Sequence, residues 1–126
     1  MALYCQQVME HFTNPRNMGE IENADGIGEA EHPSDGDLIT LNIKVSEGKL
    51  SDVKFRAYGC ANTIAVASSV TEMAIGKTLD EARGITASSV AQKFGGLPED
   101  KMHCAGVGAA ALHDAIDNYL DKQGHV

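Results

Sequence analysis

Apolar and polar residues alternate along two neighbouring segments, residues 38–45 and 50–57. A period of two is typical of a strand with one buried face. The apolar positions on that face are Leu41, Ile43, Val45, Val53 and Phe55. Residues 46–49 include a glycine and predict a hairpin connection, and residues 28–33 predict a further strand before them. We therefore expect an antiparallel meander of three strands.

The period changes from two to 3.6 at residue 61, and this change predicts a helix over residues 61–75. Its apolar stripe consists of Ile64, Ala67, Val70, Met73 and Ala74. A long final helix over residues 102–120 has a stripe of Ala105, Ala109, Leu112, Ile116 and Leu120. Shorter helices are predicted over residues 2–13, 78–82 and 86–94. Strands followed by helices indicate an α+β, two-layer fold with the helices packed on one face of the sheet.

The composition limits the function classes that need to be considered. A chain of 126 residues fits one domain, over residues 1–126, that is large enough for a hydrophobic core. The net charge of −8 argues against nucleic acid or an anionic membrane as the main partner and suits a basic patch on another protein. No apolar run approaches the ~18 residues of a membrane span, and the N-terminus lacks a signal pattern. Three widely spaced cysteines indicate reduced thiols, so we expect a cytoplasmic protein.

Cys60 lies between the strand predicted over residues 50–57 and the first long helix. The unpaired N–H groups of a first helical turn lower the pKa of a thiol beside them, which favours the thiolate that binds metal or attacks sulfur. Cys104 follows 44 residues later, beside His103, at the start of the final helix. The turn at residues 34–37 adds two carboxylates, Asp35 and Asp37.

Each of these residues has an ordinary interpretation when it is taken alone. Cys60 and Cys104 read as small core residues, and Asp35 and Asp37 as turn residues whose side chains bind local N–H groups. The spacing resembles no zinc-finger pair. Taken together, however, three element ends can meet at one end of a two-layer fold. Thiolates, an imidazole and a carboxylate form a workable ligand set for Zn²⁺ or iron, so we expect one metal or sulfur site here.

A series of short sequence motifs, spread over nearly the whole chain, strengthens the expectation of a metal or sulfur site. They are Tyr4 with Val8-Met9-Glu10-His11-Phe12, Asn14-Pro15-Arg16-Asn17, Gly36-Asp37, Phe55-Arg56-Ala57-Tyr58-Gly59-Cys60, Thr71-Glu72, Gly76-Lys77-Thr78-Leu79-Asp80-Glu81-Ala82, Leu97-Pro98 and Lys101-Met102-His103-Cys104. With these motifs the chain resembles the IscU/NifU N-terminal family of iron–sulfur cluster assembly scaffolds.

The resemblance implies an α+β fold with a three-stranded sheet and a scaffold protein that is not an enzyme. It implies a labile [2Fe-2S] cluster, or Zn or Fe(II) in the cluster-free form. The partners would be a cysteine desulfurase that uses pyridoxal phosphate, and apo iron–sulfur proteins that receive the cluster. On this resemblance Cys104 is the persulfide acceptor, Asp37 matches the aspartate that keeps the cluster labile, and Lys101 is a lysine beside the site.

One departure from the family pattern bears directly on the ligands. The first ligand motif of the family is Cys-Gly-Asp, and this chain has Asp35-Gly36-Asp37 there. A carboxylate is a hard ligand that suits Zn²⁺ or Fe²⁺ better than a cluster held by thiolates. We therefore expect a site of Asp35 or Asp37 with Cys60, His103 and Cys104, and a more labile cluster. Cys5 falls at a non-ligand position of the family, and supplies a third thiolate only if the N-terminal segment folds over the site.

Two further departures concern partners and motion. The family's chaperone-recognition motif resembles Leu-Pro-Pro-Val-Lys, but residues 97–101 add two acids, which makes binding to a heat-shock-type chaperone doubtful. Gly106 and Gly108 follow Cys104 closely. They either weaken the helix start and leave Cys104 mobile, or they allow close packing against a neighbouring element.

Two other functions compete with the scaffold. One is a zinc-bound sulfur-transfer protein similar to the SufU branch, in which Cys104 relays persulfide. That branch carries an extra segment between the second and third cysteines, for which the 44-residue separation leaves no room. The other is a diverged binding module that holds no cluster.

Overall fold

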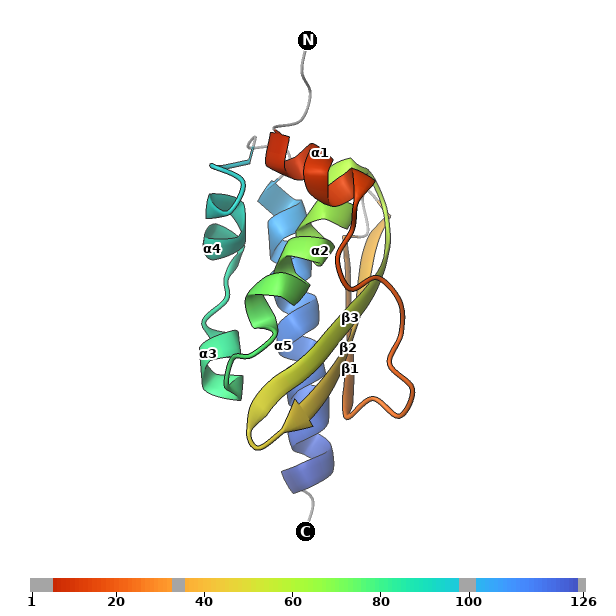
Figure 1. Ribbon diagram of the computed structural model, residues 1–126, viewed down its shortest axis with the longest axis vertical. Coiled ribbons are helices and arrows are strands. Elements are labelled where there is room, and N and C mark those ends of the chain that lie inside the picture. The colour runs from red at the N-terminus through yellow and green to blue at the C-terminus, as the bar shows by residue number, and fades with distance from the viewer. Residues whose placement is uncertain (1–5, 33–35, 98–101, 125–126) are drawn as a thin grey trace.

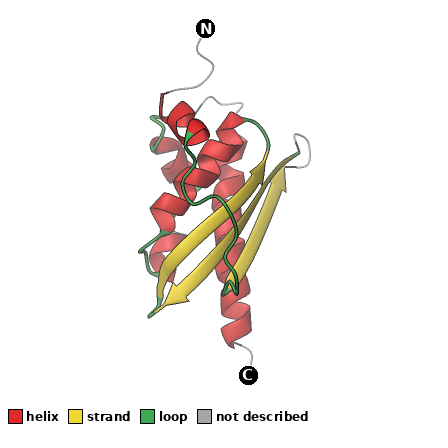
Figure 2. Cartoon of the chain, turned by 45° about the vertical axis from the view of Figure 1, so that its right-hand side comes forward, coloured by secondary structure: helices red, strands yellow, loops and turns green. Residues whose placement is uncertain are grey.

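The three-stranded antiparallel sheet predicted from the alternating segments is present. A computed structural model describes residues 6–32, 36–97 and 102–124. Strands β1 (Gly26–His32), β2 (Asp37–Ser46) and β3 (Lys49–Tyr58) lie in the order β1-β2-β3. Figure 2 shows the strands side by side as one sheet. The β2–β3 hairpin turns at Glu47 and Gly48, whose φ angles are 54° and 77°. Two consecutive positive φ angles give the tight turn that matches the twist of the paired strands.

The helices lie on one face of this sheet, as the pattern predicted. They are α1 (Gln6–Thr13), α2 (Ala61–Ala74), α3 (Leu79–Arg83), α4 (Ala87–Gln92) and α5 (Met102–Gly124). Helix α2 packs against β3, and α5 packs against β1 and β2 (Figure 1). Helix α1 packs on α2, and α3 and α4 pack on α5. No helix within the described ranges is long and apolar enough to cross a bilayer.

The hydrophobic core fills the space between the sheet and the helices α2 and α5. Fully buried side chains of β2 and β3 meet those of the two helices there. They include Ile39, Leu41, Ile43, Val53, Phe55, Val66, Val70, Leu112 and Ile116. The α+β class is confirmed, and the core fixes the ends of β2, β3, α2 and α5 relative to one another.

Helix α5 lies unusually close to β1 because Gly28 has no side chain. A Cβ atom at Gly28 would collide with the backbone of α5. The close approach lets α5 side chains bind the edge strand: the backbone N–H of Ile27 donates to Asn118 Oδ1 at 3.0 Å, and that of Glu29 donates to Asp114 Oδ2 at 2.9 Å. Side chains of α5 thus occupy N–H groups of an edge strand that would otherwise be open to pairing with another chain.

Helix α2 is buried on more sides than its predicted stripe implies. Ser68 is fully buried, yet it lies outside the stripe. Its Oγ accepts the backbone N–H of Arg16 at 2.9 Å and is 2.8 Å from His11 Nδ1. Helix α1 and the turn that follows it therefore cover the polar side of α2 and satisfy its buried hydroxyl.

The stripe predicted for the last helix was wrong at its end. Leu120 is 39% exposed. The C-terminal end of α5 projects beyond the end of the sheet (Figure 1 and Figure 2). Helix α3 begins with a capping box, in which the side chains of Thr78 and Glu81 each bind the backbone N–H of the other residue.

Candidate metal and sulfur site

Three element ends meet at one end of the two-layer fold. Asp37 is the first residue of β2, Cys60 follows the end of β3, and His103 and Cys104 lie in the first turn of α5. Asp37 is only 4% exposed and Cys104 is fully buried. The structure thus brings together Asp37, Cys60, His103 and Cys104 at one end of the fold.

The donor atoms of Asp37, His103 and Cys104 form a compact group. His103 Nε2 lies 3.0 Å from Asp37 Oδ2 and 3.6 Å from Cys104 Sγ, and Cys104 Sγ lies 3.8 Å from Asp37 Oδ2. Donor atoms around a tetrahedral Zn²⁺ ion lie about 3.3–3.8 Å apart, given metal–ligand bonds of about 2.0–2.3 Å. The three side chains therefore have the chemistry, and nearly the spacing, of three ligands of one tetrahedral cation site.

Cys60 approaches the same group through Thr63. Cys60 is the N-cap residue of α2, with extended φ and ψ angles of −77° and 178°, and its side chain makes no capping bond. Its Sγ lies 3.7 Å from Thr63 Oγ1, and the same oxygen lies 3.5 Å from Cys104 Sγ. Both sulfurs thus contact one hydroxyl, which places Cys60 beside the group formed by the other three residues.

Thr63 is a site residue that the sequence analysis missed. It follows Cys60 by three residues, so a helix beginning at residue 61 places it on the same side of the first turn. The three-residue spacing from Cys60 can be read from the sequence. Nothing in the sequence, however, distinguishes a threonine at a metal site from any other buried threonine.

The pKa of Cys104 is raised to about 12, chiefly because the thiol is buried away from water. The nearby Cys60 and Asp37 raise this pKa further by charge repulsion, and the hydrogen bond with Thr63 acts in the opposite direction. A position in the first turn of a helix is therefore not enough to favour a thiolate at Cys104. A bound cation would reverse the balance, since a metal ion deprotonates the thiols that coordinate it.

His32 also reaches the site, although the sequence analysis did not identify it. It is the last residue of β1 and lies opposite Asp37 in the strand register. Its imidazole packs on that of His103, with ring centroids 4.4 Å apart and ring planes tilted by 35°. The strand predicted before the turn ends near His32. If this strand pairs with the strand after the turn, His32 lies beside Asp37.

The two glycines after Cys104 have different surroundings. A Cβ atom at Gly108 would lie only 2.5 Å from Val66 Cγ1, so this glycine allows α5 to pack closely on α2. A Cβ atom at Gly106 would meet no heavy atom within 4 Å. Close packing, one of the two alternatives left open by the sequence, explains Gly108, and Cys104 lies buried within α5.

Several predicted site residues lie outside the described residues. They are Asp35, Lys101 and Cys5, together with residues 98–101 of the segment compared with a chaperone-recognition motif. Their roles remain predictions from the sequence.

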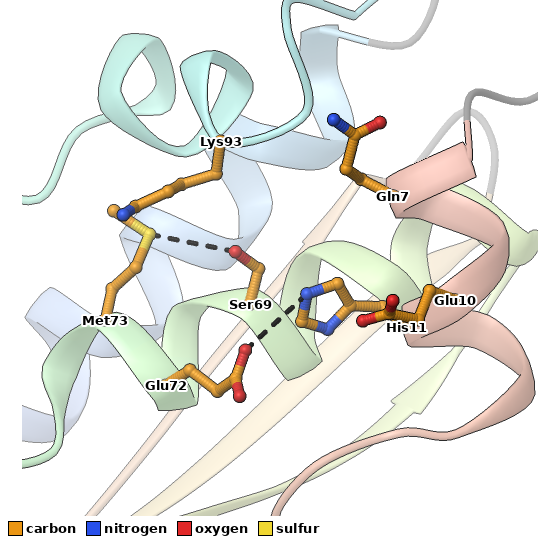
Figure 3. A pocket seen from close by; sticks show the side chains of 7 residues that line it. All are labelled: Gln7, Glu10, His11, Ser69, Glu72, Met73 and Lys93. Carbon is orange, nitrogen blue, oxygen red and sulfur yellow. Dashed lines mark hydrogen bonds and ion pairs between the residues drawn. The ribbon is translucent and has the colours of Figure 1, made fainter.

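A separate hollow of about 180 Å³ opens between α1, α2 and the end of α4 (Figure 3). It is lined by Gln7, Glu10, His11, Ser69, Glu72, Met73 and Lys93. His11 Nε2 lies 3.6 Å from Glu72 Oε1 across it, and Ser69 Oγ donates to Met73 Sδ at 3.8 Å. None of the described residues that line this hollow is a cysteine.

Comparison with known proteins gives a consistent result. Residues 3–126 match the family described as the NifU-like N terminal domain. The chain is 49% identical over 124 residues to the iron–sulfur cluster assembly scaffold protein IscU 1 of Archaeoglobus fulgidus, covering 98% of this chain and 81% of the relative. It is 40% identical over 124 residues to IscU of Escherichia coli K12, covering 95% and 96% of the two chains.

Two crystal structures share the fold. A putative scaffold protein for the SUF system from Fervidobacterium islandicum superimposes with a TM-score of 0.74 and 26% identity, over 90% of this chain and 96% of that one. A NifU-like protein from Brucella abortus superimposes with a TM-score of 0.76 and 20% identity, over 95% and 96% of the two chains, a likeness of fold alone. The matching sequence segment, the relatives and the shared fold together establish that the chain belongs to the NifU-like N terminal domain family.

Proposed function

We propose that this protein is a scaffold on which iron–sulfur clusters are assembled before they pass to other proteins. The observation that carries the proposal is the group of Asp37, His103 and Cys104, whose donor atoms all lie within 4.8 Å of one another. Cys60 adds a second sulfur through their shared neighbour Thr63. Relatives named as cluster assembly scaffolds, at 40–49% identity, support the same function.

The four side chains would hold iron and sulfide as cargo. Two thiolates and an imidazole suit cluster iron, whereas the carboxylate of Asp37 is a harder donor that binds Zn²⁺ or Fe²⁺ well. A [2Fe-2S] cluster in such a mixed site should be released more readily than one held only by thiolates. Asp35 is the alternative carboxylate. Two carboxylates at one ion repel each other, so one of the pair would bind at a time.

Sulfur would arrive as a persulfide from a cysteine desulfurase and be accepted by Cys104. In that step the Cys104 thiolate attacks the outer sulfur of the donor persulfide. A new S–S bond forms on Cys104, and the donor cysteine leaves as a thiolate. The step requires the surroundings of Cys104 to open, because its sulfur is fully buried. It also requires loss of the thiol proton, which a cation at the site would promote. Lys101 would lie beside the site, as the family resemblance implies.

The protein would act as a carrier and not as an enzyme, with a cysteine desulfurase and apo iron–sulfur proteins as its partners. The net charge of −8 suits docking to basic surfaces on such partners. A heat-shock-type chaperone is a weaker candidate, because two acids interrupt the segment at residues 97–101 that would bind it.

A zinc-bound sulfur-transfer protein is the second candidate. The carboxylate in the donor group favours it, because Asp, His and Cys are all ordinary zinc ligands. A solved scaffold of the SUF system also shares the fold. In this function Cys104 would accept and relay persulfide while zinc stays bound and no cluster forms.

Anaerobic reconstitution separates these functions. The protein is incubated with Fe²⁺, a cysteine desulfurase and excess cysteine, whose thiol also supplies electrons that reduce persulfide sulfur to sulfide. Visible absorption and intact mass are followed. A scaffold develops sulfur-to-iron charge-transfer bands that disappear in Cys60→Ser and Cys104→Ser. A zinc-bound relay shows persulfide mass on Cys104, one bound zinc and no colour. If neither colour nor persulfide appears, both functions are contradicted. A binding module without cluster chemistry then remains.

A further inference from the structure

We infer that His32 is a positioning residue that orients the imidazole of His103 toward the cation site. The inference rests on the proposed function, since it assumes that His103 Nε2 binds the cargo metal. Its basis is the packing of the two imidazole rings, whose centroids lie 4.4 Å apart with the planes tilted by 35°.

The strand register explains how His32 reaches His103. His32 ends β1 and is paired with Asp37 at the start of β2, and Asp37 Oδ2 lies 3.0 Å from His103 Nε2. The paired residues of one hairpin thus hold the same imidazole in two ways. The carboxylate of Asp37 holds one ring nitrogen, and the ring of His32 covers a ring face.

A histidine ring needs such support because rotation about its last side-chain torsion is only weakly restrained. A half-turn of the His103 ring about this torsion would exchange the positions of Nε2 and the carbon Cε1. The Nε2 atom now lies 3.6 Å from Cys104 Sγ, and the exchange would carry it away from both the sulfur and Asp37. Packing against the His32 ring opposes that rotation and keeps the donor atom facing the site.

The same geometry argues against His32 as a ligand of the same ion. Among the described residues, the donor group within 4.8 Å consists of Asp37, His103 and Cys104, and His32 does not belong to it. Imidazole lone pairs lie in the plane of the ring, and two rings packed face against face do not aim them at one point. His32 would therefore act through His103 and not on the metal.

The test compares His32→Ala, which removes the ring, with His32→Phe, which keeps a flat ring but has no nitrogen. Glu31→Ala is the matched control, because Glu31 precedes His32 on β1 and is exposed. Thermal unfolding establishes that each variant is folded. Each protein is titrated with Co²⁺ under anaerobic conditions, and the thiolate-to-cobalt absorption band is followed. In metal-free protein, the ring proton resonances of His103 are recorded by NMR.

Loss of an outer partner of a ligating histidine typically weakens metal binding 10–100-fold. We expect His32→Ala to weaken Co²⁺ binding about tenfold, at the lower end of that range. His32→Phe and Glu31→Ala should stay within about twofold of the original protein, a difference too small to indicate a lost outer partner. The His103 resonances should shift in His32→Ala, because the ring current of His32 is lost, and they should broaden if the ring rotates.

Two results would overturn the inference. If His32→Ala binds Co²⁺ as tightly as the original protein, His32 does not position His103. If His32→Phe is as weak as His32→Ala, the nitrogen of His32 matters and it acts as a ligand or hydrogen-bond partner. Failure of the original protein to show a thiolate-to-cobalt band would instead contradict the proposed site. The NMR comparison in metal-free protein would then still decide whether His32 orders the His103 ring.

Discussion

Gly59 and Asp37 lie so close together that a side chain at Gly59 would occupy the position of the Asp37 carboxylate. A Cβ atom at Gly59 would collide with Asp37 Oδ1 and lie 2.8 Å from Thr63 Oγ1. Gly59 also has a φ angle of 146°, which residues with a side chain rarely adopt. The glycine before Cys60 therefore makes room for the carboxylate that completes the donor group.

Gly59→Ala should consequently weaken cation binding as well as stability. We expect at least a tenfold loss of Zn²⁺ or Co²⁺ affinity, because Asp37 and Thr63 must move. A loss of this size is typical when the outer partners of metal ligands are disturbed. Backbone strain should cost about 1–3 kcal/mol in the free energy of unfolding.

The control for this prediction is Gly48→Ala in the β2–β3 turn. Gly48 also has a positive φ angle, 77°, but nothing lies within 4 Å of a Cβ atom there. This variant should lose about 1–2 kcal/mol of stability and keep its metal affinity. Equal metal affinity in the two variants would mean that Gly59 serves the backbone alone.

The two glycines of α5 make a second matched pair. Gly106→Ala should stabilise the protein by about 1 kcal/mol, because alanine favours the helix and its Cβ meets no neighbour. Gly108→Ala should destabilise it by about 1–3 kcal/mol, since the new methyl group overlaps Val66 and Val70 on α2. Urea unfolding measures both. Stabilisation by both substitutions would contradict close packing at Gly108.

The strands, the two long helices and the convergence of the site could be predicted from the sequence for physical reasons. Alternation fixes which side of β2 and β3 is buried, and the change of period at Cys60 marks a strand–helix corner. A two-layer fold then brings that corner to the same end as the start of α5. The side-chain chemistry of Asp37, Cys60, His103 and Cys104 made them candidates, but it was the family resemblance, more than their spacing, that joined them into one predicted site.

The remaining features depend on tertiary contacts that leave no local pattern. His32 matters only because strand pairing sets it beside Asp37 and near His103. The buried hydroxyl of Ser68 depends on α1 packing across α2. The raised pKa of Cys104 follows from burial, which a helix-start argument does not measure.

The burial of His11 predicts a dependence of stability on pH. Burial, followed by the positive charge of Arg16, lowers the pKa of His11 below its ordinary value of 6.5. The unfolded chain therefore binds the proton more readily than the native protein does. The contribution of neutral His11 to the stability of the native protein is present above pH 6.5. It is lost as the pH falls through the lowered pKa of His11 in the native state.

Urea unfolding at a series of pH values between 8 and 5 tests this prediction. His11→Gln should reduce the loss of stability on acidification, because glutamine takes up no proton. An unchanged pH dependence in His11→Gln would assign the acid sensitivity to other groups.

Replacing Asp35 tests the alignment of the turn with the first ligand motif of the family. Asp35→Cys should lengthen the lifetime of a reconstituted cluster severalfold, because a thiolate holds cluster iron more firmly than a carboxylate. Ser34→Cys adds a thiol one position earlier and is the control. Decay of the visible bands in air or with a chelator gives the lifetime. If Asp35→Cys behaves like the control, Asp35 does not occupy a ligand position.

The central claim is that side chains from β2, the β3–α2 corner and α5 bind the same ion. X-ray absorption spectroscopy of the protein loaded with one equivalent of Zn²⁺ tests it most directly. We predict two sulfur ligands near 2.3 Å and two nitrogen or oxygen ligands near 2.0–2.1 Å. The spectrum should lose one sulfur in Cys60→Ser and one in Cys104→Ser. A shell without sulfur, or one unchanged by either substitution, would contradict the claim.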